Sequence, residues 1–410
     1  MQTPVATINR HQRAISSALV LFLAVGLLLP ASWRLLRGLP NPTLTSSSEP
    51  SLDYMMSIEY GWIMQSQTAD GAIAQTYRGD SVIPYFANLS ALALVRENPR
   101  AVRDYMEWYL SHVNKPDSSG LFGTIYNYAG VPITSPPDVR VASAEAQTRI
   151  IIAPKYGPAA KSDFQPTGEY DSADSYASTF LSLVEDYTAS TNDLTFARRH
   201  VANIKLVADV ILALQDDDGL VWAKADHPKK YLMDNSENYR GLEDFSALLS
   251  RLDLADLARG YGVAAQRVKD GILDRLWDAK TKTFYWYLDQ NGRRARVNWR
   301  TWYPDAVSQV FPILDGLISP SDPRAQGLWA ALNKYHEDWV SRMDVTPWAI
   351  VAYVATVMGD SQRADAAIDT LRAAVVKAQR DPQWHSAESA FIYLAYEARR
   401  GRLPKHYLVN

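Results

Sequence analysis

The chain has 410 residues, of which 47% are hydrophobic, so it is long enough to bury a substantial core. Its formal net charge of −3 gives no electrostatic basis for binding nucleic acid. It contains no cysteine, which excludes disulfides, thiolate zinc sites, iron–sulfur clusters and a cysteine nucleophile. Export is not excluded, because a chain of this length can be stable without disulfides.

The first 50 residues differ in character from the rest. An apolar run covers residues 14–30 behind Arg10 and Arg13. It is close to the lower limit of about 17–25 residues for a membrane-spanning helix. We predict a tail over 1–13, a transmembrane anchor or signal sequence over 14–30 and an extended linker over 31–50. The folded part, 51–410, is then membrane-anchored and extracytoplasmic, or secreted if the apolar segment is cleaved.

Helical periodicity dominates from residue 51 onward. It predicts twelve helices, at 52–65, 84–97, 101–113, 171–189, 194–215, 235–252, 254–277, 305–317, 323–339, 347–358, 361–379 and 386–399. A long irregular segment, 114–169, separates the third helix from the fourth, and loops of this length in a compact domain are usually functional. The turn Asp-Gln-Asn-Gly at 289–292 predicts a β-hairpin.

The predicted helices alternate in character. Even-numbered ones, such as the one containing 349–355, are apolar nearly all round, whereas odd-numbered ones, such as 364–379, are amphipathic. An all-apolar helix is buried and an amphipathic helix lies outside it. Six such alternations predict an all-α fold, an (α/α)6 barrel whose inner helices all begin at one end, where the long loops and short β-hairpins gather. Because the hairpins carry no strict sequence repeat, a twisted helical solenoid remains an alternative.

Acidic residues gather at the predicted starts of the inner helices. Asp171 and Asp174 are three residues apart and share a face, as do Asp234 and Glu237. Comparable positions in later helices hold Asp305 and Glu388. Each of these acids is also a candidate for plain helix capping, because an acid in the first turn stabilises the free backbone amides there.

The order of these elements resembles the six-hairpin glycosidase superfamily over about residues 51–399. The motifs that carry the resemblance are Asp-Ser-x-Asp-Ser at 171–175, Asp-Asn-Ser-Glu at 234–237 and Tyr-Pro-Asp at 303–305. The resemblance is architectural and assigns no individual glycoside hydrolase family. It implies a carbohydrate cleft over the N-termini of the inner helices and a pair of carboxylates for acid and base catalysis.

Glycoside cleavage needs one protonated carboxyl for the leaving oxygen and one ionised carboxylate that activates water or attacks directly. The predicted catalytic set is Asp174, Glu237, Asp171, Asp234, Asp305 and Glu388. Asp174 and Glu237 are favoured, because Asp171 and Asp234 can satisfy the backbone amides and leave the second acid of each pair without a structural duty. Predicted substrate-binding residues on or beside the loops, mostly aromatic rings that can stack on sugar, are Trp222, Tyr231, Trp299, Trp302, Tyr303, Trp384 and His385.

The sequence thus predicts a glycoside hydrolase whose partners are a carbohydrate, an oligosaccharide or exported polysaccharide, and the membrane that holds its N-terminal helix. One alternative is a non-catalytic glycan-binding or polysaccharide-assembly protein. Another is a polysaccharide lyase, with Tyr170, Tyr176 or His385 as base and Arg240 to neutralise a uronate.

No cofactor and no metal site is predicted. The run Asp216–Gly219 lacks the ligand spacing of an EF-hand loop, and the histidines show no paired metal-ligand spacing. Phosphate-binding and dinucleotide-binding motifs are also absent from the sequence.

Overall fold

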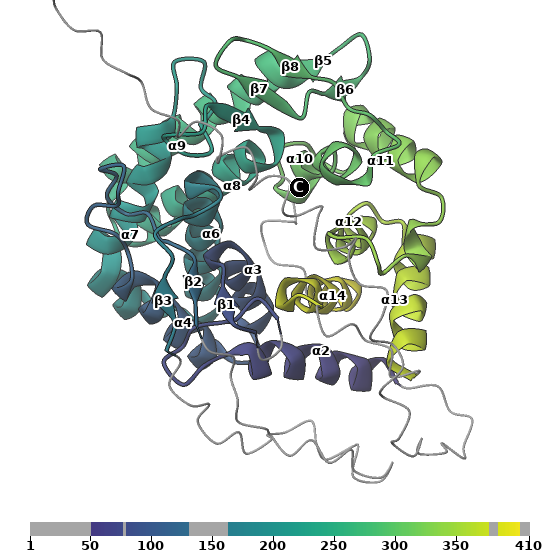
Figure 1. Cartoon of the computed structure of the whole chain (residues 1–410), viewed down its shortest axis with the longest axis horizontal. Coiled ribbons are helices and arrows are strands. Elements are labelled where there is room, and N and C mark those ends of the chain that lie inside the picture. The colour runs from purple at the N-terminus through teal and green to yellow at the C-terminus, as the bar shows by residue number, and fades with distance from the viewer. Residues whose placement is uncertain (1–50, 77–78, 131–162, 377–383, 402–410) are drawn as a thin grey trace, which may run out of the picture. The chain divides into compact units, whose positions relative to one another are not determined.

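The helices of the described chain alternate between an inner and an outer layer (Figure 1). The computed structural model describes residues 51–76, 79–130, 163–376 and 384–401, which belong to one compact unit spanning 50–410. The outer α-helices of this part are α2 (Leu52–Ser66), α4 (Pro99–Ser111), α7 (Leu194–Leu214), α9 (Ala255–Gly271), α11 (Pro323–Tyr335) and α13 (Ser361–Val376). The inner ones are α3 (Pro84–Leu94), α6 (Ala173–Thr191), α8 (Leu232–Arg251), α10 (Phe311–Leu314), α12 (Ala349–Val357) and α14 (Ser386–Arg399).

The inner helices form a closed ring. Going round it, α3 contacts α6, then come α8, α10, α12 and α14, and α14 returns to α3. A solenoid would leave its first and last hairpins apart, so this contact excludes that alternative. The predicted (α/α)6 arrangement is confirmed.

Burial follows the predicted alternation of helix character. Every residue from 349 to 355 in the inner helix α12 is buried. The outer helix α4 buries one side only, through residues such as Val102, Tyr105 and Met106. All-round apolarity therefore identified inner helices correctly, because a helix in the middle layer meets other helices on every side.

Short antiparallel strands decorate the loops that enter the inner helices. β1 (Ser81–Val82), β2 (Tyr128–Ala129) and β3 (Gln165–Pro166) form one sheet in that order. A second sheet has the order β4 (Lys229–Tyr231), β7 (Tyr287–Asp289) and β8 (Arg294–Ala295), while β5 (Trp277–Asp278) pairs with β6 (Thr283–Phe284). The pairing of Leu288 with Arg294 confirms the hairpin predicted around 289–292.

The predicted helix at 305–317 departs most from expectation. It is divided into a π-helical turn, η3 (Trp302–Ala306), and the short helix α10. Tyr303 has an extended backbone within that turn, with ψ of 136°. Pro304 explains this, because the residue before a proline is restricted to extended conformations. The predicted helix at 254–277 likewise ends at Gly271 and continues as a π-helical turn, η2 (Ile272–Leu276).

The apolar run at 14–30 lies outside the described residues, so its role as a membrane anchor stays a prediction. Among the helices within 51–76, 79–130, 163–376 and 384–401, none has the length and apolarity needed to cross a bilayer.

Candidate active site

The N-terminal turns of two inner helices, α6 and α8, bring four of the predicted acids together. Asp174 lies in the first turn of α6, and Asp234 and Glu237 lie in the first two turns of α8. Asp171 lies just before α6. In the described part of the chain, none of these four carboxyls is within ion-pair distance of a lysine, arginine or histidine. The site is therefore an uncompensated acidic cluster.

Asp174 is fully buried at the bottom of this cluster. Its Oδ1 accepts from the Ser172 hydroxyl at 2.6 Å and from the Ser175 amide at 2.8 Å, and its Oδ2 accepts from Asn238 Nδ2 at 2.7 Å. Sequence reasoning left Asp174 without a structural duty, and the structure corrects this. Asp174 is held through both carboxylate oxygens by three hydrogen-bond donors.

Asp234 is half-buried and lies beside Asp174. Ser172 Oγ stands between the two, 2.9 Å from Asp234 Oδ2. Burial, opposed by the Ser172 hydroxyl and reinforced by the charge of Asp171, raises the pKa of Asp234 to about 7. The predicted capping by Asp234 is not found: α8 begins at Leu232 with Tyr231 as its N-cap, which makes Asp234 the third residue of the helix, within its first turn.

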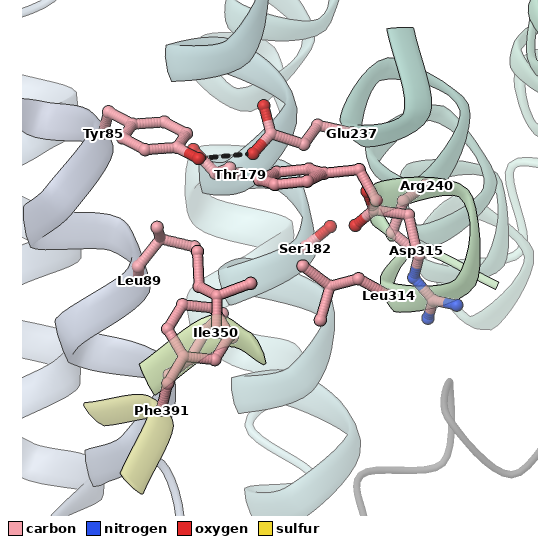
Figure 2. A pocket seen from close by; sticks show the side chains of 12 residues that line it. Tyr85, Leu89, Thr179, Ser182, Glu237, Arg240, Leu314, Asp315, Ile350 and Phe391 are labelled. Atoms are coloured by element: carbon pink, nitrogen blue, oxygen red, sulfur yellow. Dashed lines mark hydrogen bonds between the residues drawn. The ribbon is translucent and has the colours of Figure 1, made fainter. Parts of the chain in front are cut away.

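Glu237 is the acid that faces the bore of the ring. Its Oε1 accepts from the Tyr85 hydroxyl at 2.6 Å, and Figure 2 shows this bond crossing from α3 to α8. Burial, then the charges of Asp315 and Asp234, raises the pKa of Glu237 well above its usual value. Below Glu237 is a cavity of about 30 Å³, room for one or two waters, lined from all six inner helices and by Asp315.

Phenol groups surround the carboxyls on the open side. The backbone at Tyr303 is extended, and its side chain is 45% exposed. Desolvation of its hydroxyl and the nearby charges of Asp234, Asp171 and Glu237 raise the pKa of Tyr303. The Tyr231 hydroxyl is 2.8 Å from His227 Nε2, and the Tyr231 ring is nearly parallel to the rings of His227 and Trp286, with centroids 5.9 and 6.1 Å away. Tyr303 and Tyr231 thus lie near the acidic cluster, and Tyr231 belongs to strand β4.

Two of the predicted acids instead accept hydrogen bonds from backbone amides. Asp305 is buried and accepts from the Asn298 amide at 2.6 Å, which closes the loop before η3. Glu388, also buried, accepts from the amides of Trp348 and Ala349 at the start of the neighbouring helix α12, the latter at 2.6 Å. Burial raises the pKa of Glu388 to about 7, although these amides oppose the rise.

Of the residues predicted to bind substrate, some lie partly exposed on one loop and others pack against the protein interior or a helix end. Trp299 is half-buried and stacks on the exposed ring of Tyr335, with centroids 6.0 Å apart, and Trp302 and Tyr303 follow it on the same loop. Trp384 is buried, and its indole nitrogen donates to Ser389. Lys230 lies over the ring of Trp222. His385 is the N-cap of α14, packed edge-on to Phe86.

The basic residues near the site already have acidic partners. Arg240 forms a two-point ion pair with Asp244, and the buried Lys230 binds Asp216 and Asp218, each at 2.7 Å. A lysine ammonium thus sits on the acidic run at 216–218. Within the residues that the structure describes, no group of acids and histidines is arranged to hold a metal ion.

Solved structures share this arrangement of helices. A glycosidase in complex with glucose aligns with a TM-score of 0.55 and 15% identity, over 85% of this chain and 97% of that one. A rhamnosidase from Klebsiella oxytoca with rhamnose bound aligns with a TM-score of 0.53 and 14% identity, over 88% of this chain and 66% of that one. The chain has the (α/α)6 fold of six-hairpin glycosidases.

At these identities the likeness establishes the fold alone. A rhamnosidase from Bacillus sp. GL1 aligns with a TM-score of 0.41 and 18% identity. The alignment covers 57% of this chain and 27% of that protein. No family model and no curated protein matches the sequence.

Sequence reasoning missed the polar residues that join the acids. Tyr85 holds Glu237, Ser172 joins Asp174 to Asp234, and Asn238 holds Asp174. The sequence did contain a signal for two of these residues, Tyr85 and Ser172. Tyr85 follows Pro84 at the start of a predicted inner helix, and Ser172 lies within the motif at 171–175. Their partners lie 152 and 62 residues away, which spacing within one helix does not reveal.

Proposed function

We propose that the chain is a glycoside hydrolase acting on an oligosaccharide or an exported polysaccharide. The observation that carries the proposal is the cluster of Asp171, Asp174, Asp234 and Glu237, which lacks a neutralising cation in the described chain. Buried carboxyls with raised pKa values that face one another supply both a proton donor and a carboxylate. Aromatic rings beside them offer faces to sugar.

Asp234 and Glu237 are the proposed working pair. Asp234 is half-buried and holds a proton near neutral pH, as a general acid for the leaving oxygen requires. Burial raises the pKa of Glu237, and the Tyr85 hydroxyl that donates to it at 2.6 Å opposes this rise. That hydrogen bond favours the carboxylate form, in which Glu237 would activate water or attack the sugar. Asp171, exposed at the rim, is the third carboxylate in reach of a ligand.

In the hydrolysis, Asp234 gives its proton to the glycosidic oxygen as the bond from that oxygen to the anomeric carbon breaks. A water oxygen bonds to the anomeric carbon, directly or after Glu237 has formed a covalent intermediate, and loses a proton to a carboxylate. The sum is one water consumed for each glycosidic bond. Asp174 stays behind Asp234 as a fixed negative charge.

The test is digestion of a panel of glycans by the chain from Ser51 onward, with detection of new reducing ends. New reducing ends that vanish in Glu237→Gln support the proposal. Saturable glycan binding without cleavage favours the glycan-binding alternative, to which the burial of Asp174 and Glu237 lends some weight. An unsaturated product indicates a lyase, although Arg240 is engaged by Asp244 and is poorly placed to neutralise a uronate.

The pH dependence of this reaction follows from Asp234. Its pKa is raised to about 7, and a general acid works only while it is protonated. We expect kcat/KM to fall about tenfold per pH unit above this pKa, and to fall again at low pH where the raised pKa of Glu237 leaves that carboxylate protonated. A rate profile measured from pH 5 to 9 checks this. A profile that instead rises through pH 7 would assign Asp234 the role of base.

We propose that the ring of Trp299 forms part of the surface that binds sugar. We expect Trp299→Ala to raise KM about five- to tenfold, since a lost stacking contact costs roughly 1 kcal/mol, with little loss of stability. Trp384→Ala is the matched control: its ring is buried, so the change should cost about 3–5 kcal/mol of unfolding free energy. Urea unfolding and steady-state kinetics on both variants separate the two effects. A large stability loss in Trp299→Ala with unchanged KM contradicts the platform role.

The proposed location is extracytoplasmic, with residues 14–30 as the anchor or signal sequence. All described elements belong to the unit 50–410, so deletion of residues before Leu39 should leave a soluble domain that unfolds cooperatively. Thermal unfolding of the truncated protein checks this, and protease treatment of intact cells shows which side of the membrane the domain faces. An insoluble truncated product would argue against the division.

A further inference from the structure

One hydroxyl group lies between two carboxyls in the acidic cluster. Ser172 Oγ is 2.6 Å from Asp174 Oδ1 and 2.9 Å from Asp234 Oδ2. Both separations are hydrogen-bond lengths, and each bond needs its own proton. A serine hydroxyl has one proton to donate. If both carboxyls were ionised, one of the two contacts would bring lone pairs together without a proton between them.

We propose that Asp174 and Asp234 share one carboxyl proton across the Ser172 hydroxyl at neutral pH, and that Asp234, the less buried of the two acids, carries it. The proton count itself follows from the geometry of the three side chains. Its catalytic meaning rests on the proposed function, in which Asp234 is the acid. Ser172 and Asp174 are then positioning residues, which act on the substrate only through Asp234.

The hydrogen bonds decide which carboxyl is ionised. Asp174 accepts from Ser172, the Ser175 amide and Asn238, so donors occupy both of its oxygens. A carboxylate with three donors is strongly favoured in its charged form. The 2.6 Å contact has the length of a hydroxyl donating to a carboxylate, and the 2.9 Å contact is longer, as between neutral groups. Ser172 therefore donates to Asp174 and accepts from Asp234.

The surroundings hold the proton in place. The acids that face Asp234 are Asp171 before α6, Asp174 in α6 and Glu237 in α8, and the phenols are Tyr85 in α3, Tyr231 before α8 and Tyr303 in η3. Burial raises the pKa of both members of the pair, and the charge of Asp234 raises that of Asp174 further. The two titrate as one unit. A Ser172 hydroxyl that donates to Asp174 leaves Asp234 to keep its proton to higher pH.

Infrared spectroscopy of the whole protein tests the shared proton without any substrate. We expect a protonated-carboxyl band at pH 7 that disappears in Asp234→Asn. In Asp174→Asn the band of Asp234 should be lost about one pH unit or more below the parent, because the neighbouring negative charge is gone. The control is Asp117→Asn. Asp117 is another buried carboxylate, which accepts from Thr124 and Tyr170, and its removal should leave the band unchanged.

Ser172 variants keep the test valid if Asp174→Asn does not fold. In Ser172→Ala the Asp234 acid loses its acceptor, so its C=O band should move to higher frequency. Ser172→Thr retains the hydroxyl and should restore the parent band. No band lost in Asp234→Asn, or an unchanged titration in Asp174→Asn together with an unmoved band in Ser172→Ala, overturns the proposal.

Kinetics then separate this inference from the proposed function. If the parent cleaves glycans, the pH above which kcat/KM falls should drop in Asp174→Asn by the amount seen in the spectra, with KM little changed. If the parent cleaves no glycan, the proposed function fails, while the spectra still decide whether the proton is shared. If the pH shift of kcat/KM in Asp174→Asn differs from the shift of the carboxyl band, Asp234 is not the acid.

Discussion

Asp234→Asn and Glu237→Gln should each lower turnover by about 10²–10⁴-fold, the usual loss when a general acid or base is removed. Both substitutions keep the shape of the side chain and most of its hydrogen bonding. Asn at 234 still meets Ser172, and Gln at 237 still accepts from Tyr85 through its carbonyl oxygen. Stability should therefore change little. The measurement is kcat on a glycan that the parent cleaves, together with urea unfolding.

Glu243→Gln is the matched control for this pair. Glu243 lies on the same helix, α8, but is exposed and outside the acidic cluster, so its amide should leave kcat unchanged. Near-normal turnover in both Asp234→Asn and Glu237→Gln would remove them from the mechanism. The exposed carboxylate of Asp171 would then be the next to test.

Glu388→Ala should lower the stability of the fold strongly. Its carboxylate accepts from the amides of Trp348 and Ala349 at the buried start of α12. Removing it leaves two buried donors without their acceptor, at a cost of about 1–3 kcal/mol each. We expect the free energy of unfolding to fall by about 2–5 kcal/mol, measured by urea denaturation.

Two further variants serve as controls for the stability loss in Glu388→Ala. Asp256→Ala also removes an acid from the first turn of a helix, α9, but its side chain is 94% exposed, so the change should stay within about 0.5 kcal/mol. Glu388→Gln keeps one acceptor oxygen and should cost less than Glu388→Ala. Native stability with lost turnover in Glu388→Gln would instead place Glu388 in the catalytic machinery.

The sequence by itself determined the architecture, a ring of inner helices within a layer of outer helices. Runs such as 349–355, which are apolar on every side, require burial in an inner layer. Both this apolarity and helical periodicity depend on neighbouring residues, so the sequence alone reveals them. The shared face of Asp234 and Glu237 is equally local, since three residues of helix place them on one side.

Only the tertiary structure decided which acids lie together and which bind backbone amides. Tyr85 reaches Glu237 across the bore, Ser172 joins Asp174 of α6 to Asp234 of α8, and Glu388 of α14 caps α12. Each of these bonds joins different helices. Trp384, which the sequence predicted to bind substrate, is buried beside Trp348. The physical reason is that capping, burial and pKa depend on groups brought near by ring closure, and the spacing within one helix does not record them.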